Sequence, residues 1–156
     1  MTTTKSKIAL VTGGSRGLGR NMALSLAQKG IDVLFTYNSN KQKADEVVAE
    51  IEALGQRAVA FQLDTSNVQQ FDAFFSQVTA RLTELTGSAK FDFLINNAGL
   101  AVYAPCAETT EAQFDEALNI HYKGVFFLTQ KALNFIHDGG RIINITSVHE
   151  DWPMPG

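Results

Sequence analysis

The stretch TGGSRGLG, residues Thr12 to Gly19, decides how the rest of this chain is interpreted. It follows a short apolar run that begins at Lys7 and has the composition of a buried strand, and it leads into a segment of helical composition. Glycine at such a turn permits positive φ and lets a pyrophosphate approach the backbone, while the helix that begins there offers free N–H groups. The turn therefore predicts a dinucleotide site. A glycine-rich turn without a ligand is the alternative.

Strand-like and helix-like segments alternate along the whole chain. The expected strands are residues 7–12, 31–37, 57–63, 91–96 and 141–146, and the expected helices are residues 17–29, 41–54, 68–85 and 110–135. Thr110 and Gln113 form a T-x-x-Q capping box, and Gly30 and Gly55 each end a helix. Because parallel strands need crossover helices, the alternation predicts a doubly wound α/β parallel sheet in a single domain, residues 1–156.

Composition argues against several classes of function. The 156 residues include 13 basic and 16 acidic side chains, for a net charge of -3, without a dense basic cluster, so nucleic acid is not an expected partner. No segment is apolar for long enough to span a membrane, and the run after MTTTKSK is too short for a signal peptide, so a cytoplasmic protein is expected. Cys106 is the only cysteine, and no cluster has metal-ligand spacing, so neither disulfides nor a metal site is expected.

Several motifs in the same order resemble the short-chain dehydrogenase/reductase family. The glycine turn reads T-G-x-x-x-G-x-G, NNAG (Asn96 to Gly99) follows the fourth strand, Asn119 lies in the long helix within ALNIHYKGVF, and Ser147 ends the fifth strand in IINITS. The chain is similar to 3-oxoacyl-ACP-reductase-like and glucose-dehydrogenase-like members. The resemblance implies a Rossmann-like sheet with strand order 3-2-1-4-5. It also implies hydride transfer between a nicotinamide and a ketone or secondary alcohol, and a homo-oligomer, either a dimer or a tetramer.

The resemblance and the glycine turn together assign the cofactor-binding residues. These are Gly13, Ser15, Arg16, Gly17, Leu18, Gly19, Asn38, Ser39, Asp64, Asn96, Ala98 and Gly99, with Asp64 beside the adenine. NAD-preferring sites usually hold the ribose 2′-OH with a carboxylate at the end of the second strand, and FTYNSNK, residues 35–41, contains none. Arg16 can instead pair with a 2′-phosphate, with Asn38 and Ser39 as hydrogen-bond donors. NADP(H) is therefore predicted in preference to NAD(H); a solvated Arg16 and N-capping of the next helix by Asn38 and Ser39 are the alternatives.

Reduction of a carbonyl needs a proton at the oxygen as well as a hydride. In the family, a Tyr followed one helical turn later by a Lys supplies that proton. The resemblance implies that Ser147 binds the substrate oxygen and Asn119 supports the proton relay. The alternatives are a strand-end Ser that caps a turn and a helix Asn that bonds locally. Family members carry the Tyr-x-x-x-Lys motif a dozen or so residues beyond Ser147, past the last residue here, and Tyr122 and Lys123 are adjacent and cannot replace it.

The sequence accordingly predicts the N-terminal part of a longer protein. The apolar fifth strand would be an exposed edge without a further neighbour, and Val125 to Leu128 carry more apolar surface than one sheet face covers. The competing hypothesis is a truncated, non-catalytic member that binds NADP(H). A sugar-nucleotide epimerase is disfavoured because such enzymes resemble a different glycine pattern. His149, Glu150 and Trp152 are candidates for lining a substrate pocket, with an ordinary polar loop as the alternative.

Overall fold

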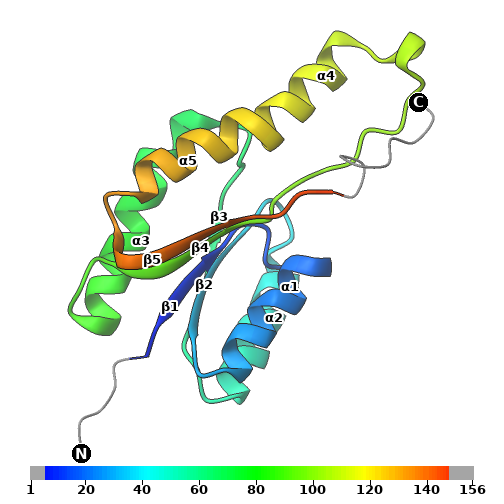
Figure 1. Cartoon of the computed structure of the whole chain (residues 1–156). Helices are drawn as coiled ribbons and strands as arrows, with labels where there is room; N and C mark the ends of the chain where they lie inside the picture. The colour runs from blue at the N-terminus through cyan, green and yellow to red at the C-terminus, as the bar shows by residue number, and fades with distance from the viewer. Residues whose placement is uncertain (1–5, 148–156) are drawn as a thin grey trace, which may run out of the picture.

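The computed structural model describes residues 6–147 and confirms the doubly wound parallel sheet (Figure 1). The strands are β1 (Ile8–Val11), β2 (Asp32–Tyr37), β3 (Ala58–Gln62), β4 (Phe91–Asn96) and β5 (Ile136–Asn144). Their order in the sheet is β3-β2-β1-β4-β5, as predicted. The direction of winding reverses between β1 and β4, so the carboxyl ends of these two strands form the switch point at which open α/β sheets bind ligands. The loop that followed Ser147 in the sequence predictions, with His149, Glu150 and Trp152, lies outside the described residues.

Helices cover both faces of the sheet, as right-handed crossovers in two directions require. On one face lie α1 (Gly17–Gln28) and α2 (Lys41–Ala53). On the other lie α3 (Phe71–Thr86), preceded by the short η1 (Val68–Gln70), and α5 (Val125–Ala132). Between β4 and α5 come η2 (Cys106–Glu108) and α4 (Glu111–Leu118), which extends beyond the carboxyl edge of the sheet (Figure 1).

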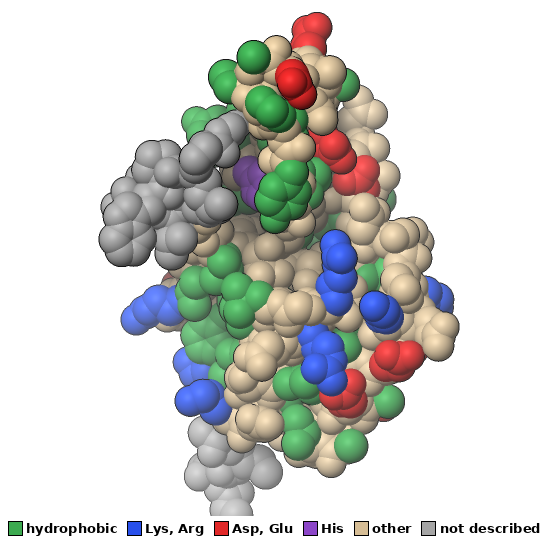
Figure 2. Space-filling model, turned by 90° about the vertical axis from the view of Figure 1, so that its right-hand side faces the viewer, with side chains coloured by type: hydrophobic (Ala, Val, Ile, Leu, Met, Phe, Trp, Pro, Cys, Tyr) green, Lys and Arg blue, Asp and Glu red, His purple; other side chains and the backbone are tan. Residues whose placement is uncertain are grey.

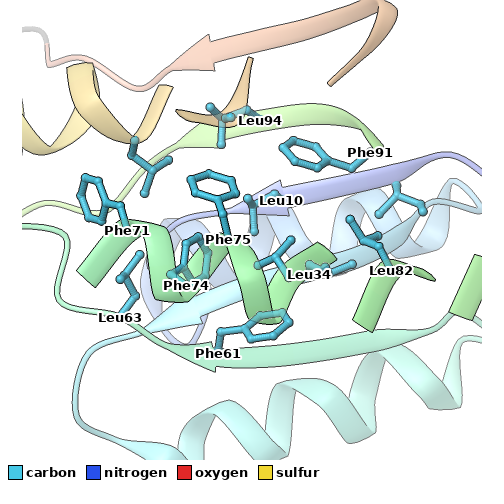
Figure 3. Packing of buried hydrophobic residues seen from close by; sticks show 14 residues of the cluster. Leu10, Leu34, Phe61, Leu63, Phe71, Phe74, Phe75, Leu82, Phe91 and Leu94 are labelled. Atoms are coloured by element: carbon cyan, nitrogen blue, oxygen red, sulfur yellow. The ribbon is translucent and has the colours of Figure 1, made fainter. Parts of the chain in front are cut away.

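Phenylalanine side chains dominate the core between α3 and the sheet. Phe71, Phe74 and Phe75 of α3 are each at most 3% exposed and point toward the strands (Figure 3). The ring of Phe74 meets that of Phe61 edge-on, with centroids 5.9 Å apart. Leu94, from the middle of β4, is fully buried in the same cluster. This core fixes β4 against α3 and so sets the position of one strand at the switch point.

The core beneath α1 is built from smaller side chains. Ala23 and Ala27 of α1 are at most 2% exposed and pack with Val33 and Phe35 of β2. Because alanine adds only one methyl group, α1 can lie close to the sheet. The amino end of α1 is thereby held near the carboxyl end of β1.

The long helix predicted from Thr110 toward Phe135 is observed, but it contains a π-helical stretch and its last α-helical residue is Ala132. Its start is as expected: Gln113 N–H donates to Thr110 Oγ1 at 3.3 Å, and Thr110 N–H donates to Gln113 Oε1 at 2.9 Å. The α-helix then gives way to a π-helix, η3 (Asn119–Gly124), before α5 begins. A Cβ on Gly124 would lie 2.1 Å from the Thr65 carbonyl oxygen, so the helix passes another backbone segment where only glycine fits.

Strand β5 is longer than predicted, because it begins at Ile136 rather than at Arg141. Gly139 has φ +79, and the pairing of β5 with β4 shifts register between Phe91 and Phe93, as at a β-bulge. The bulge lets the strand continue through Gly139 and Gly140. Three isoleucines on or just after β5 are 38–48% exposed: Ile142, Ile143 and Ile145. Within the described chain, β5 is thus an apolar edge strand.

We expect Leu94→Ala to lower the free energy of unfolding by about 3 kcal/mol, because it leaves a cavity in the closely packed core on the α3 side. Urea unfolding followed by circular dichroism measures this change. Leu54→Ala is the matched control, since Leu54 is 44% exposed at the end of α2, and it should change the value by less than about 0.5 kcal/mol. Equal effects of the two substitutions would contradict the packing described.

Candidate functional site

The glycine turn links β1 to α1 and is confirmed as a close-packed backbone structure. Gly13 and Gly17 have φ +70 and +55, in the region that favours glycine. Gly14 and Gly19 are required by packing instead. A Cβ on Gly14 would lie 2.6 Å from the Phe35 Cβ, and one on Gly19 would lie 2.1 Å from the Gly13 carbonyl oxygen. The turn therefore brings bare backbone to the start of α1, where N–H groups are free to bind an anion.

Thr12 joins this turn to the segment that follows β4. Its Oγ1 accepts hydrogen bonds from the backbone N–H groups of Asn97 and Ala98, each at 2.9 Å. In return, the Asn97 side chain donates to the carbonyl oxygens of Thr12 at 2.9 Å and Gly13 at 3.3 Å. Thr12 is only 3% exposed. The carboxyl ends of β1 and β4 are thus held together across the switch point.

A cavity of about 510 Å³ lies over the switch point, within the range of ligand pockets. Most of the predicted cofactor residues line it: Gly13, Ser15, Arg16, Gly17, Leu18, Gly19, Asn38, Asp64, Ala98 and Gly99. Other residues line it without having been predicted: Thr36, Leu63, Thr65, Asn97, Leu100, Glu116 and Ile120. Asn97 lies inside the NNAG motif, and Leu63, Thr65 and Leu100 adjoin predicted residues, so a sequence signal existed for these four. Glu116 and Ile120 reach the cavity from α4 and η3 through the tertiary fold, which no motif indicated.

Asn96 and Ser39 lie away from this cavity. Asn96 is 5% exposed, and its Nδ2 donates to Thr129 Oγ1 at 3.0 Å and to Asn144 Oδ1 at 2.8 Å. It therefore ties β4 to α5 and β5. Ser39 is exposed in the bend before α2.

The N-cap of α2 is Asn40, whose Oδ1 accepts from Lys43 N–H at 2.9 Å. The alternative that Asn38 or Ser39 caps this helix is therefore wrong. Asn38 instead lines the cavity, and its carbonyl oxygen accepts from Gln62 Nε2 at 2.9 Å. That bond connects the carboxyl ends of β2 and β3.

Charged side chains lie at both ends of the cavity. Asp64, just after β3, accepts on Oδ1 from the N–H and the hydroxyl of Ser66, at 2.9 and 2.7 Å. Arg16 is exposed at the N-cap of α1 and lines the cavity. Arg20, one turn further along, binds Glu50 of α2 at 2.5 Å, and this hydrogen bond and charge raise the pKa of the Arg20 guanidinium. Arg16 therefore lines the cavity, whereas Arg20 is paired with Glu50.

The two predicted catalytic residues come from different sides of the site. Ser147 is exposed three residues after β5, beyond Ile145, whose N–H donates to the Asn96 carbonyl oxygen at 2.9 Å. Asn119 is the half-buried first residue of η3. Among the described residues that line the cavity, α4 and η3 are represented by Glu116 and Ile120 rather than by Asn119.

One Tyr-x-x-x-Lys spacing was missed in the sequence, at Tyr37 and Lys41. Tyr37 is the buried last residue of β2, whereas Lys41 begins α2. The two side chains therefore do not share a helical face. Lys41 Nζ also pairs with Asp45 at 2.7 Å, and this hydrogen bond and charge raise the Lys41 pKa. The pair does not replace the family motif.

The family model described as short chain dehydrogenase matches residues 7–156. The chain belongs to the short-chain dehydrogenase family. It is 37% identical over 142 residues to the hydroxynaphthalene reductase-like protein Arp2 of Metarhizium brunneum, covering 91% of the chain and 51% of that protein. It is 35% identical over 150 residues to hydroxynaphthalene reductase arp2 of Aspergillus fumigatus, covering 96% of this chain and 53% of that protein. This short-chain dehydrogenase sequence thus spans about half the length of the curated relatives it matches.

Solved structures share the fold closely. The angucycline C-6 ketoreductase LanV with bound NADP has a TM-score of 0.92 and 37% identity, covering 96% of this chain and 58% of that one. A blue fluorescent protein from a metagenomic library, in complex with NADPH, has a TM-score of 0.86 and 38% identity, covering 96% of this chain and 60% of that one. The short-chain dehydrogenase fold observed here is therefore one that binds NADP(H) in similar proteins.

The described residues contain neither a membrane-spanning helix nor a cluster of metal ligands. None of the helices between residues 6 and 147 is both long enough and apolar enough to cross a membrane. In the same part of the chain, no three His, Cys, Asp or Glu side chains gather as metal ligands would.

We expect Thr12→Val to destabilise the protein by about 2–4 kcal/mol, because it leaves two backbone N–H groups without their acceptor. Thr12→Ser is the matched control: it keeps the hydroxyl and should cost less than about 1.5 kcal/mol for the lost methyl group. Urea unfolding of both variants measures the difference. If valine were tolerated as well as serine, Thr12 would not be the link described.

Proposed function

We propose that this chain forms the nucleotide-binding part of an NADP(H)-dependent reductase that acts on a ketone or secondary alcohol. The observation that carries the proposal is the cavity over the switch point, walled by the glycine turn and the start of α1. A pyrophosphate can approach the backbone of this turn at Gly17, where a Cβ would meet no protein atom within 4 Å. The adenine half would lie over β2 and β3, near Asp64 and Asn38. The nicotinamide half would lie over β4 and β5, toward Ser147.

The electrostatics of the cavity favour NADP(H) over NAD(H). Strand β2 ends in Tyr37 and Asn38, so no carboxylate stands where an NAD site usually holds the ribose 2′-OH. Lys41 pairs with an acidic side chain of α2, as Arg20 does, whereas Arg16 lines the cavity. Lys and Arg side chains gather across the middle of the face that Figure 2 shows. A guanidinium at Arg16 would bind a 2′-phosphate with charge-assisted hydrogen bonds.

The bound nicotinamide would supply or accept the hydride, and the described residues would position the reactants. Ser147, in the segment after β5, would donate a hydrogen bond to the substrate oxygen. Asn119 remains the candidate that family resemblance gives for the proton relay. The proton itself would come from a Tyr and Lys pair carried beyond residue 156, in the half of the family's length that this sequence does not span.

The names of the relatives suggest a substrate class. One of them is a hydroxynaphthalene reductase, another is a hydroxynaphthalene reductase-like protein, and one structural neighbour is an angucycline C-6 ketoreductase. We therefore propose a ketone on a fused aromatic ring system as the substrate. A small aliphatic ketone is the second candidate, because an acetoin dehydrogenase from Enterobacter cloacae is 35% identical with a TM-score of 0.85.

We also propose that the protein forms a homo-oligomer. Apolar side chains stand exposed along α4 and α5, as a subunit interface would require. They are Phe114, Leu118, Phe126 and Leu133, each 45–61% exposed.

Oxidation of NADPH at 340 nm, with 1-tetralone or acetoin as substrate, tests the activity in the purified protein. We expect turnover with NADPH and a larger kcat/KM for the tetralone. A larger value for acetoin would overturn the substrate class and leave the reductase proposal standing. NADPH binding without turnover of either ketone, by a protein whose intact mass is near 17.0 kDa, would favour the non-catalytic NADP(H)-binding alternative.

Arg16→Ala should weaken NADPH binding about tenfold, because one charge-assisted hydrogen bond contributes about 1.5 kcal/mol. NADH binding should stay within about twofold, since it lacks the 2′-phosphate that the guanidinium would hold. Fluorescence titration of both cofactors gives the two dissociation constants. Arg20→Ala is the control because Arg20 is held by Glu50. Parallel losses for NADPH and NADH would argue against a 2′-phosphate site at Arg16.

A further inference from the structure

We propose that His121 is a positioning residue of this site, which holds the segment from Asn97 to Leu100 against the nicotinamide side of the cavity. The inference rests on the proposed function, because it concerns how the proposed cofactor is held.

The contact that carries the inference joins two segments 21 residues apart in sequence. Nε2 of His121 lies 2.8 Å from the Leu100 carbonyl oxygen and 3.3 Å from the Leu100 backbone nitrogen. An imidazole protonated on Nε2 donates to the carbonyl oxygen, and the opposite neutral tautomer accepts from the N–H. Leu100 itself lines the 510 Å³ cavity. The side chain of His121 thus binds the backbone of a cavity wall directly.

Gly99 makes this contact sterically feasible. A Cβ at Gly99 would lie 2.8 Å from Cε1 of His121 and 3.4 Å from its Nδ1. The imidazole therefore packs closely against the backbone of Gly99, at a position where a larger residue would collide with the ring. Gly99 also lines the cavity, so the ring is packed against a residue of the cavity wall.

The π-helix places His121 where it can reach this wall. Gly124, the last residue of η3, is fixed against the Thr65 carbonyl oxygen, which sets the position of the wider turn. His121 lies in the middle of that turn. It also lines a groove of about 670 Å³ between α5 and β5, together with residues 144–146, which lead to Ser147. One side chain therefore lies beside both the cavity wall and the strand end that delivers the proposed substrate contact.

The wall has a second anchor at its other end. Thr12 holds the N–H groups of Asn97 and Ala98 from the β1 side. His121 holds Leu100 from the helix side. Between the two anchors stands Gly99, whose backbone is the least restrained of any residue type. Loss of His121 should therefore free Gly99 and Leu100 and leave the adenine side of the cavity unchanged.

Two ligands distinguish this role from a general loss of structure. NADPH would occupy both halves of the cavity, whereas 2′,5′-ADP would occupy only the adenine half. We expect His121→Ala to weaken NADPH binding about fivefold to tenfold, the effect of one lost hydrogen bond. The dissociation constant of 2′,5′-ADP should stay within about twofold, because its contacts lie away from the anchor. Calorimetric titration of the purified protein measures both.

Two further variants complete the test. His121→Gln should recover most of the NADPH affinity, because the Gln amide can donate to the Leu100 carbonyl oxygen from a similar reach. Lys123→Ala, at an exposed position two residues away on η3, should bind NADPH within about twofold of the wild type. Equal losses for NADPH and 2′,5′-ADP in His121→Ala, no rescue by Gln, or a larger effect of Lys123→Ala would each overturn the inference.

A spectroscopic readout tests the contact itself. Addition of NADPH should shift the imidazole resonances of His121 in the wild-type protein and leave those of His137, on β5, in place. Failure of His121 to respond would count against the positioning role. If the wild-type protein bound neither NADPH nor 2′,5′-ADP, the proposed function itself would fail and the inference would fall with it.

Discussion

The site depends on one buried hydroxyl. Thr12 Oγ1 accepts from two consecutive backbone N–H groups, those of Asn97 and Ala98, and so joins the end of β1 to the segment after β4. The chain leaves the two strands in different directions, because β1 continues into α1 and β4 continues toward α4. The hydroxyl adds to the backbone pairing of β1 with β4 and to the hydrogen bond from Thr12 N–H to the Ile95 carbonyl oxygen at 3.0 Å. Together these contacts hold the glycine turn and the NNAG segment side by side as two walls of one cavity.

The lining of the cavity differs from one side to the other. On the β2 and β3 side it includes the polar residues Asn38 and Asp64. On the β4 side it includes the small residues Ala98 and Gly99, with Glu116 and Ile120 contributed by α4 and η3. Polar side chains can recognise the sugar and base of a nucleotide, and small residues let a flat ring approach closely. This asymmetry agrees with the proposed orientation of NADP(H), with its reactive ring toward β5.

The sequence predicted most of the fold because its signals are local. Apolar runs, capping residues and glycine stops located the strands and helices, and the spacing from Thr12 to Gly19 identified the turn. Features that depend on distant partners were not predictable in this way. Periodicity could not reveal η3, because its cause is the carbonyl oxygen of Thr65 packed against Gly124. Motif spacing placed Asn96 in the cofactor site, yet its side chain binds Thr129 and Asn144. The single-domain boundary, the cytoplasmic location and the oligomeric state stay predictions.

The packing at Gly19 also bears on the entropy of filling the site. The space that a Cβ would take is already occupied by the Gly13 carbonyl oxygen and the Asn97 amide. The turn, the start of α1 and the start of the NNAG segment are therefore packed directly against one another. A preformed surface of this kind reduces the ordering entropy lost on association.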